Sequence, residues 1–106
     1  MPEQVVATRE FETDAGILRL EVIPKGGDAP AFKYRILNSN GDEIESLEVY
    51  GADSVQALLF CLTAAGDYLQ RYVPSASFFE TGVSGLPITD IGAVGEWRAR
   101  ISIPTE

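Results

Sequence analysis

The sequence predicts an α+β fold in which an antiparallel sheet packs one long helix on one face, in the order β-β-β-β-α-β-β. Segments within residues 5–50 alternate apolar and polar side chains, as half-buried strands do. Residues 54–72 repeat apolar side chains at helical spacing, and alternation returns at residues 96–103. We expect about five to six strands in one sheet and a single domain over residues 1–106.

The composition is that of an ordinary folded domain, with 106 residues of which 45% are hydrophobic and 23% are charged. A chain of this size can bury a core without disulfides or metals. Sixteen acids against eight bases give a formal net charge of −8, and the bases form no cluster. Such a charge repels phosphate backbones and anionic lipids, so we expect neither a nucleic acid nor a membrane as partner.

Location is predicted from cysteine content and from the first residues. Cys61 is the only cysteine, so no disulfide can form within the chain. The segment after Met1 lacks the basic and apolar regions of a signal peptide, and no apolar run approaches membrane-spanning length. We expect a cytoplasmic protein.

The first two expected strands, residues 5–12 and 16–24, form a hairpin. The polar link between them, residues 13–16, is short enough for a tight turn. The second strand alternates apolar and charged side chains in the order Leu18, Arg19, Leu20, Glu21, Val22. This alternation predicts one buried face and one face in water.

The third and fourth strands are expected to form a second hairpin. Residues 24–30 hold two prolines and two glycines, which predicts a loop. An Asn-Gly turn within residues 38–42 then joins the third strand, residues 32–36, to the fourth, residues 43–50. The third strand alternates apolar and basic side chains in the order Phe32, Lys33, Tyr34, Arg35, Ile36.

The fourth strand is acidic, with Glu43, Glu45 and Glu48 and no base. Across the expected hairpin it faces Lys33 and Arg35. Cross-strand pairs, worth about 0.2–1 kcal/mol each, account for both sets of charges. The three glutamates are also candidate residues of a protein interface.

The strongest local pattern is a helix start that contains Gly51, Asp53, Ser54 and Gln56. Asp53 can accept a hydrogen bond from the first free amides of the helix, and Gln56 can reach back as in a capping box. Gly51 permits a sharp turn from strand to helix. The pattern predicts a helix over residues 54–72. As an alternative, Asp53, Ser54 and Gln56 bind a ligand or the backbone of a partner.

One stripe of this helix is expected to face the sheet. Its members are Val55, Leu58, Leu59, Leu62, Ala65, Leu69 and Tyr72. Residues 57–62 are apolar on every face, which is more than one sheet contact covers. Either the C-terminal loop or a second copy of the chain covers the surplus, because apolar patches of this kind mark interfaces. The candidate interface residues on the helix are Ala57, Phe60 and Ala64.

The C-terminal third is expected to be a long packed loop followed by a strand. Residues 73–95 are rich in Ser, Gly and Pro but also hold several large apolar residues, which a solvated linker would lack. We expect one short strand at residues 77–80 and no regular structure after it. Residues 96–103 alternate apolar side chains, Trp97 among them, with arginines, and should add a last strand to the sheet.

The sequence offers little for catalysis. It contains no histidine, which excludes imidazole bases, imidazole metal ligands and histidine-containing triads. Cys61 lies among Leu and Phe, where burial makes a thiol inert. We therefore expect no catalytic residue, no metal site and no cofactor. Paired carboxylates are the remaining acid–base option, from among Glu43, Glu45, Glu48, Asp53, Asp67, Glu80 and Asp90.

Residues 50–62, which read Tyr-Gly-Ala-Asp-Ser-Val-Gln-Ala-Leu-Leu-Phe-Cys-Leu, resemble a motif of a family of small uncharacterised bacterial proteins. In that family a Gly-x-Asp-Ser-x-Gln-Ala-Leu motif opens a long apolar helix after several strands. The chain departs from the family's aromatic, Gly-rich ending at residues 86–92. The resemblance implies a bacterial origin and a fold, and it implies no reaction.

Two functions remain open. The first is a non-catalytic module that associates with itself, as a homodimer, or with another protein, and toxin neutralisation of the immunity-protein type is one concrete form. The acidic fourth strand and the apolar surface near Phe60 favour it. The alternative is a small carboxylate-dependent enzyme, or a binder of a small ligand, that uses residues 74–95 as a lid.

Overall fold

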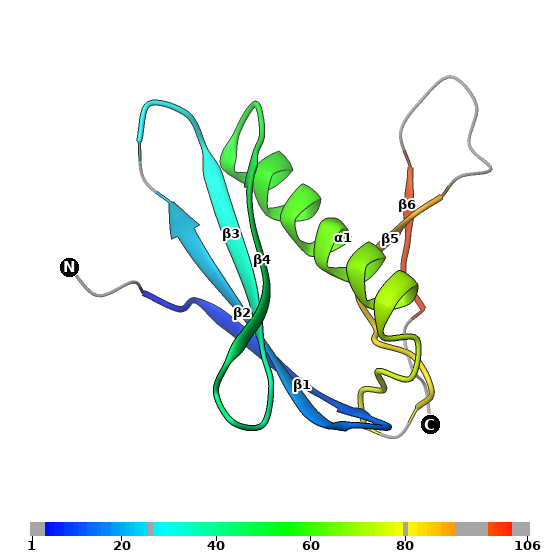
Figure 1. Ribbon diagram of the computed structural model, residues 1–106. Helices are drawn as coiled ribbons and strands as arrows, with labels where there is room; N and C mark the ends of the chain where they lie inside the picture. The colour runs from blue at the N-terminus through cyan, green and yellow to red at the C-terminus, as the bar shows by residue number, and fades with distance from the viewer. Residues whose placement is uncertain (1–3, 26, 80, 91–97, 103–106) are drawn as a thin grey trace.

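The computed structural model describes residues 4–25, 27–79, 81–90 and 98–102. Four antiparallel strands form the main sheet in the order β1-β2-β3-β4, and one long helix lies on it (Figure 1). A separate two-stranded sheet pairs β5 with β6. The elements are β1 (Ala7–Thr13), β2 (Gly16–Lys25), β3 (Ala31–Leu37), β4 (Glu43–Tyr50), α1 (Ser54–Tyr72), β5 (Ile88–Thr89) and β6 (Ala99–Arg100).

Tight turns build the sheet as a meander. Thr13 pairs with Gly16, so β1 and β2 are joined by a two-residue link, and Gly16 adopts a positive φ of 119° that favours glycine. In the turn between β3 and β4, the side-chain oxygen of Asn38 accepts from the amides of Asn40 and Asp42 at 2.9 and 3.0 Å. Both hairpins of the sequence prediction are confirmed.

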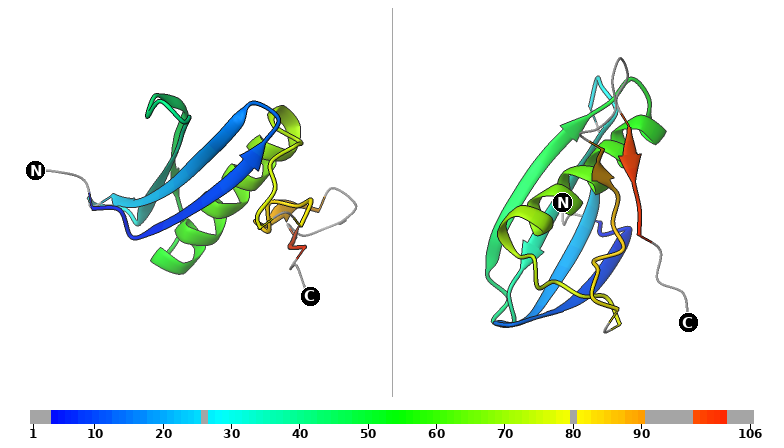
Figure 2. Two further views of the ribbon diagram at one scale, coloured as in Figure 1. Left: turned by 90° about the horizontal axis from the view of Figure 1, so that it is seen from below. Right: turned by 90° about the vertical axis from the view of Figure 1, so that its right-hand side faces the viewer.

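The core lies between the sheet and the helix. Apolar side chains of β1, β2 and β3 meet a row of small residues on α1, and the helix crosses one face of the sheet (Figure 2). The expected α+β class, with one helix on one face of an antiparallel sheet, is confirmed. The most deeply buried members of the core are Phe11, Leu20, Val22, Tyr34, Ile36, Cys61, Ala65 and Leu69.

The expected helix stripe is wrong in part. Val55, Leu59 and Tyr72 are exposed, by 63%, 50% and 62%. The buried stripe instead includes Ala57 and Cys61, which with Ala65 and Leu69 step four residues at a time along the side facing the sheet. Small side chains allow the helix to approach the strands closely, which places the larger Val55 and Leu59 outside the contact.

We expected the last strand to extend the main sheet, and this prediction is wrong. β6 pairs with β5, and β5 contacts α1, so the helix lies between the main sheet and this small pair (Figure 2). Asp67 of the helix accepts from the Thr89 amide at 2.8 Å and from its hydroxyl at 2.6 Å. A Cβ on Gly66 would collide with the carbonyl oxygen of Pro87. These contacts hold β5 on the helix, and β6 pairs with β5 at that place. Trp97 lies outside the described residues.

The short strand expected at residues 77–80 is not formed over residues 77–79, and residue 80 lies outside the described residues. Ser77 forms an isolated bridge with Glu12 of β1, with both backbone hydrogen bonds at 2.8 and 2.9 Å. Phe79 then has a positive φ of 50°, which ends extended structure. The segment therefore covers the end of β1 as a bridge and a turn. In the part of the chain that is described, no helix combines the length and the apolar character needed to cross a bilayer.

Candidate functional site

The motif at the start of α1 is a helix cap. Asp53 has extended backbone, and its Oδ1 accepts from the Gln56 amide at 2.8 Å. The Gln56 side chain reaches back and accepts from the amide of Ala52 at 2.7 Å. The two bonds form a reciprocal box, shifted by one residue from the usual partner of the Gln side chain. The predicted cap is thus present, and each of these side chains already has a partner within the motif.

Gly51 is required by packing. A Cβ at this position would meet the backbone of Ala57, with the Ala57 Cα at 2.8 Å. The strand therefore enters the helix so closely that only glycine fits. Ala57 is fully buried in this contact, so its expected role at an interface is wrong. Ala64 is half-buried and packs against the core, and Phe60 is half-buried.

The acidic residues of β4 have different surroundings. Glu45 lies on the helix side of the sheet and accepts from the Tyr34 hydroxyl at 2.9 Å. Burial raises the pKa of this hydroxyl, and the bond to Glu45 raises it further. Glu48 lies on the other face, opposite Lys33, and accepts from Tyr50 at 2.6 Å. Glu43 is exposed near the start of the strand. The three glutamates therefore do not form one carboxylate cluster.

The sheet face opposite the helix carries an ion-pair network that sequence reasoning missed. Glu21 is 8% exposed and bonds to two arginines, Arg35 at 2.6 Å and Arg19 at 3.1 Å. Burial raises the pKa of Glu21, but the bonds and charges of Arg35 and Arg19 together hold it below its usual value. The expected pairing of Arg35 with β4 is replaced in part, because Arg35 lies opposite Ser46 and bonds to Glu21. The alternation of side chains in β2 already placed Arg19 and Glu21 on the same face of the sheet, so it could have indicated this ion pair.

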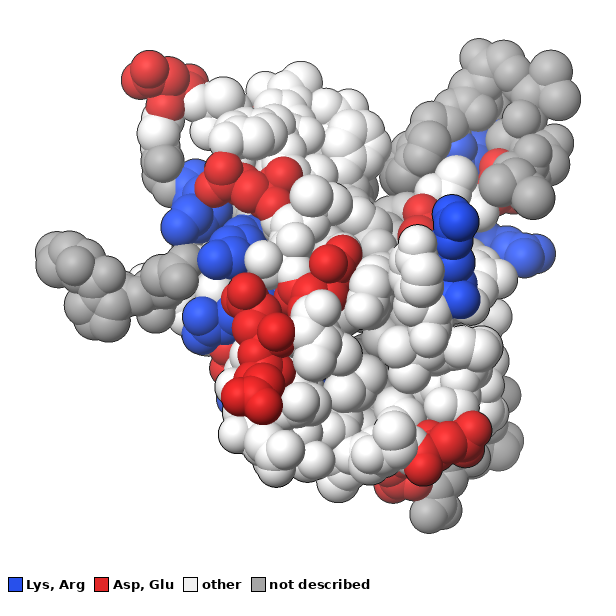
Figure 3. Space-filling model, viewed as in Figure 1, with Lys and Arg blue, Asp and Glu red and all other residues white. Residues whose placement is uncertain are grey.

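β4 forms one edge of the sheet, and acidic side chains gather along it in the space-filling view, with basic side chains beside them (Figure 3). The edge also exposes apolar surface. Leu47 and Tyr50 of β4 are 47% and 57% exposed, and Val55 follows in the first turn of α1. This combination of an exposed strand, acids and large apolar side chains is the candidate interface.

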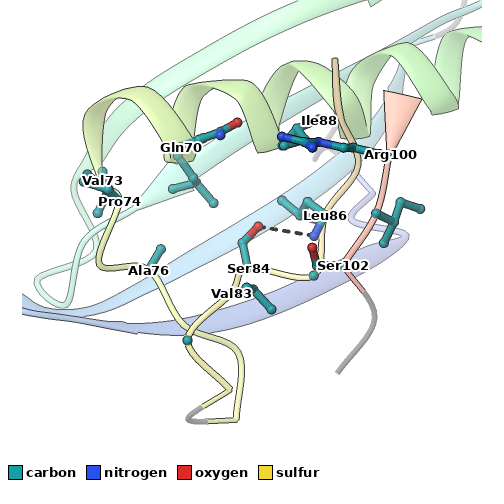
Figure 4. A pocket seen from close by; sticks show the side chains of 14 residues that line it. Gln70, Val73, Pro74, Ala76, Val83, Ser84, Leu86, Ile88, Arg100 and Ser102 are labelled. Carbon is teal, nitrogen blue, oxygen red and sulfur yellow. Dashed lines mark hydrogen bonds between the residues drawn. The ribbon is translucent and has the colours of Figure 1, made fainter. Parts of the chain in front are cut away.

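A pocket of about 360 Å³ lies between the C-terminal end of α1 and the segments that follow it (Figure 4). Apolar residues such as Leu69 and Leu86 form part of its wall, and Gln70 and Ser84 add polar groups. Arg100 is the charged side chain of its described lining, which holds no Asp or Glu. The expected lid, residues 74–95, supplies part of the wall.

Neither a metal centre nor a reactive thiol is found among the described residues. Within residues 4–25, 27–79, 81–90 and 98–102, no three Cys, Asp or Glu side chains are grouped to hold a metal ion. Cys61 is fully buried, and burial raises the pKa of its thiol to about 12. A thiol in that state is protonated near neutral pH and is a poor nucleophile.

Comparison with known proteins adds no relative: no family model, no curated protein and no solved structure matches this chain. The resemblance of residues 50–62 to a bacterial family therefore stays a prediction. Its helix-capping geometry is a property of the chain itself.

Proposed function

We propose that this protein is a non-catalytic interaction module that binds another protein or a second copy of itself in the cytoplasm. The observation that carries the proposal is the β4 edge, which combines exposed apolar side chains with acidic ones. Large apolar side chains that are exposed beside charged ones are common at protein-binding sites. Cys61 is the only cysteine and is buried, so nothing in the cysteine content points to an oxidising compartment.

A concrete form of this function is neutralisation of a basic effector by an acidic immunity-type protein. The small size and the net charge of −8 support this form, since opposite charge speeds association and selects partners. The β4 edge supplies a surface on which such a partner can dock. A homodimer is the other form.

Light scattering after size-exclusion chromatography separates these forms, and cross-linking in cells followed by mass spectrometry searches for the partner. Self-association at micromolar concentration, or a reproducible cross-link from the β4 edge, supports an interaction module. A strict monomer that forms no cross-link through Leu47, Tyr50 or Val55 replaced by a photo-reactive residue contradicts it. The same photo-reactive residue at Asp28, in the loop before β3, is the control.

The alternative function is binding of a small ligand in the pocket beside α1. The observation in its favour is the volume of about 360 Å³, which lies within the range of small-molecule sites. The described lining offers Arg100 and polar groups but no paired carboxylates, so it favours ligand binding over acid–base catalysis. A ligand-detected NMR screen tests it, with Leu86→Trp filling the pocket. Hits that bind the variant as well as the wild type would count against this site.

A further inference from the structure

We propose that the free edge of β4 receives an extended basic segment of another protein as a fifth strand of the sheet. The inference rests on the proposed function and names its site and the chemistry of the partner. It starts from the backbone, because an open strand edge presents unpaired amides and carbonyls that another chain can use.

The direction of the β4 backbone groups follows from the register. The Gly51 amide donates to the Pro30 carbonyl at 3.2 Å, which marks the hydrogen-bonded pair at that end of the β3–β4 ladder. Such pairs alternate along an antiparallel ladder. The backbone groups of Leu47 and Val49 therefore point toward β3, and those of Ser46, Glu48 and Tyr50 point outward. Among the described residues no strand pairs with this outer side of β4.

The opposite edge of the sheet, formed by β1, is partly covered by later residues of the chain. At β1, Glu12 exchanges both backbone hydrogen bonds with Ser77, and the Asp14 amide donates to the Ser75 hydroxyl at 3.2 Å. Arg9 adds a bond to the Ser84 carbonyl at 3.2 Å and lies 3.9 Å from the centre of the Phe78 ring. The chain thus covers part of the β1 edge with its own residues, while the β4 edge stays open in the described structure.

The charges along the edge select a basic occupant. Glu48 is exposed on the sheet face opposite the helix, where Lys33 is its neighbour on β3, and Glu43 is exposed at the start of β4. β4 itself contains no base. A second copy would bring another net charge of −8 to the same place, whereas a basic strand would place its cations beside the glutamates.

The side chains of β4 also predict the pattern of the occupant. Residues directly opposite each other in a sheet share a face. On one face the new strand would meet Ser46, Glu48 and Tyr50, and on the helix face it would meet the exposed Leu47. We therefore expect basic and apolar residues to alternate along the bound segment.

The experiment uses a capped ten-residue peptide of alternating lysine and valine as the probe, titrated into the full chain and followed by NMR and calorimetry. Two control peptides test the two parts of the inference. One replaces every lysine with glutamate, and the other is methylated at the backbone nitrogens of one edge, which keeps the charge and removes the donors. We expect binding of the first peptide only, with shifts at the amides of Ser46 and Glu48.

Ser46→Pro removes an outward amide and adds a ring at the edge, a change that edge strands tolerate. We expect this substitution to weaken binding of the lysine peptide at least tenfold. Ser39→Pro is the matched control, because Ser39 follows Asn38 in a turn closed by the bond from the Gly41 amide to the Asn38 carbonyl, where proline is favoured. The NMR spectrum of each variant reports whether it is folded. Glu43→Gln with Glu48→Gln should weaken binding without a backbone change.

The outcomes separate this inference from the proposed function. Equal binding by the methylated peptide, by the acidic peptide or by Ser46→Pro overturns strand addition of a basic segment, as does an absence of binding. A concentration-dependent dimer that Ser46→Pro dissolves also overturns it, since the occupant is then a second copy, but leaves the interaction module standing. Failure of the proposed function itself would appear as a monomer without cross-links from this edge.

Discussion

Asp53 stabilises the start of the helix, because its carboxylate accepts a hydrogen bond from the Gln56 amide, which would otherwise lack a partner. We predict that Asp53→Ala lowers the free energy of unfolding by about 1 kcal/mol, the usual loss for an N-cap. Asp53→Ser should retain most of the stability, and Ser54→Ala should change little, because neither of the two cap bonds uses the Ser54 side chain. Urea denaturation measures all three. Equal stability of Asp53→Ala and the wild type would contradict the capping role.

The lowered pKa of Glu21 makes the stability of the fold depend on pH. Arg35 and Arg19 hold the folded pKa of this carboxylate below its usual value of about 4.3, so its contribution is complete above that pH and is lost as pH falls through the folded pKa. Glu21→Gln should be less stable than the wild type by about 1–3 kcal/mol at pH 7, because two arginines lose a charged partner.

The measurement is urea denaturation of both proteins between pH 7 and pH 3, with Glu12→Gln, an exposed glutamate of β1, as control. The difference between Glu21→Gln and the wild type should shrink below about pH 4. A difference that stays constant over the whole range would show that the ion pairs with Glu21 do not stabilise the fold.

At the scale of elements, Gly66 and Pro87 join α1 to β5. A Cβ on Gly66 would collide with the Pro87 carbonyl oxygen and lie 3.2 Å from the Leu86 Cβ. Alanine favours helices over glycine by about 1 kcal/mol, but the collision should reverse this sign. We predict that Gly66→Ala lowers stability by about 1–3 kcal/mol and shifts the Thr89 amide signal, as Asp67 loses its bond to it. A more stable variant with an unchanged Thr89 signal would contradict the contact.

The elements that sequence predicted well are those set by local chemistry. The turns at residues 13–16 and 38–42 and the helix start at Asp53 depend on residues a few positions apart. The helix stripe was assigned wrongly because two apolar stripes overlap on α1. The choice between them depends on how closely the sheet and the helix pack, which favours Ala57 and Cys61 over Val55 and Leu59.

The pairing of the C-terminal strand could not be predicted for a different reason. Its apolar alternation is equally compatible with the main sheet and with β5. The decision depends on contacts far apart in the sequence, such as Gly66 with Pro87 and Asp67 with Thr89. For the candidate site, the sequence predicted an acidic strand at β4. It could not predict the bond of Glu45 to Tyr34 or the burial of Glu21, because both depend on how the strands and the helix pack.

For the molecule as a whole, the two edges of the sheet differ in how they are covered. The segment around Ser77 pairs with part of β1, and the described chain places no strand beside β4. A net charge of −8 limits self-association at an edge that carries glutamates, and it favours a basic partner. Among the described residues β4 is therefore an open edge strand that exposes Leu47 and Tyr50, and it is the surface that we propose for interaction.

Amide hydrogen exchange of β4 in the free, dilute protein tests this account most directly. Leu47 and Val49 donate toward β3 and should exchange slowly, whereas Ser46 and Glu48 point outward and should exchange rapidly, so that protection alternates along the strand. If the amides of Ser46 and Glu48 are instead as strongly protected as those of Leu47 and Val49 in a monomer, the edge is already occupied, and the account of β4 as the interaction surface is wrong.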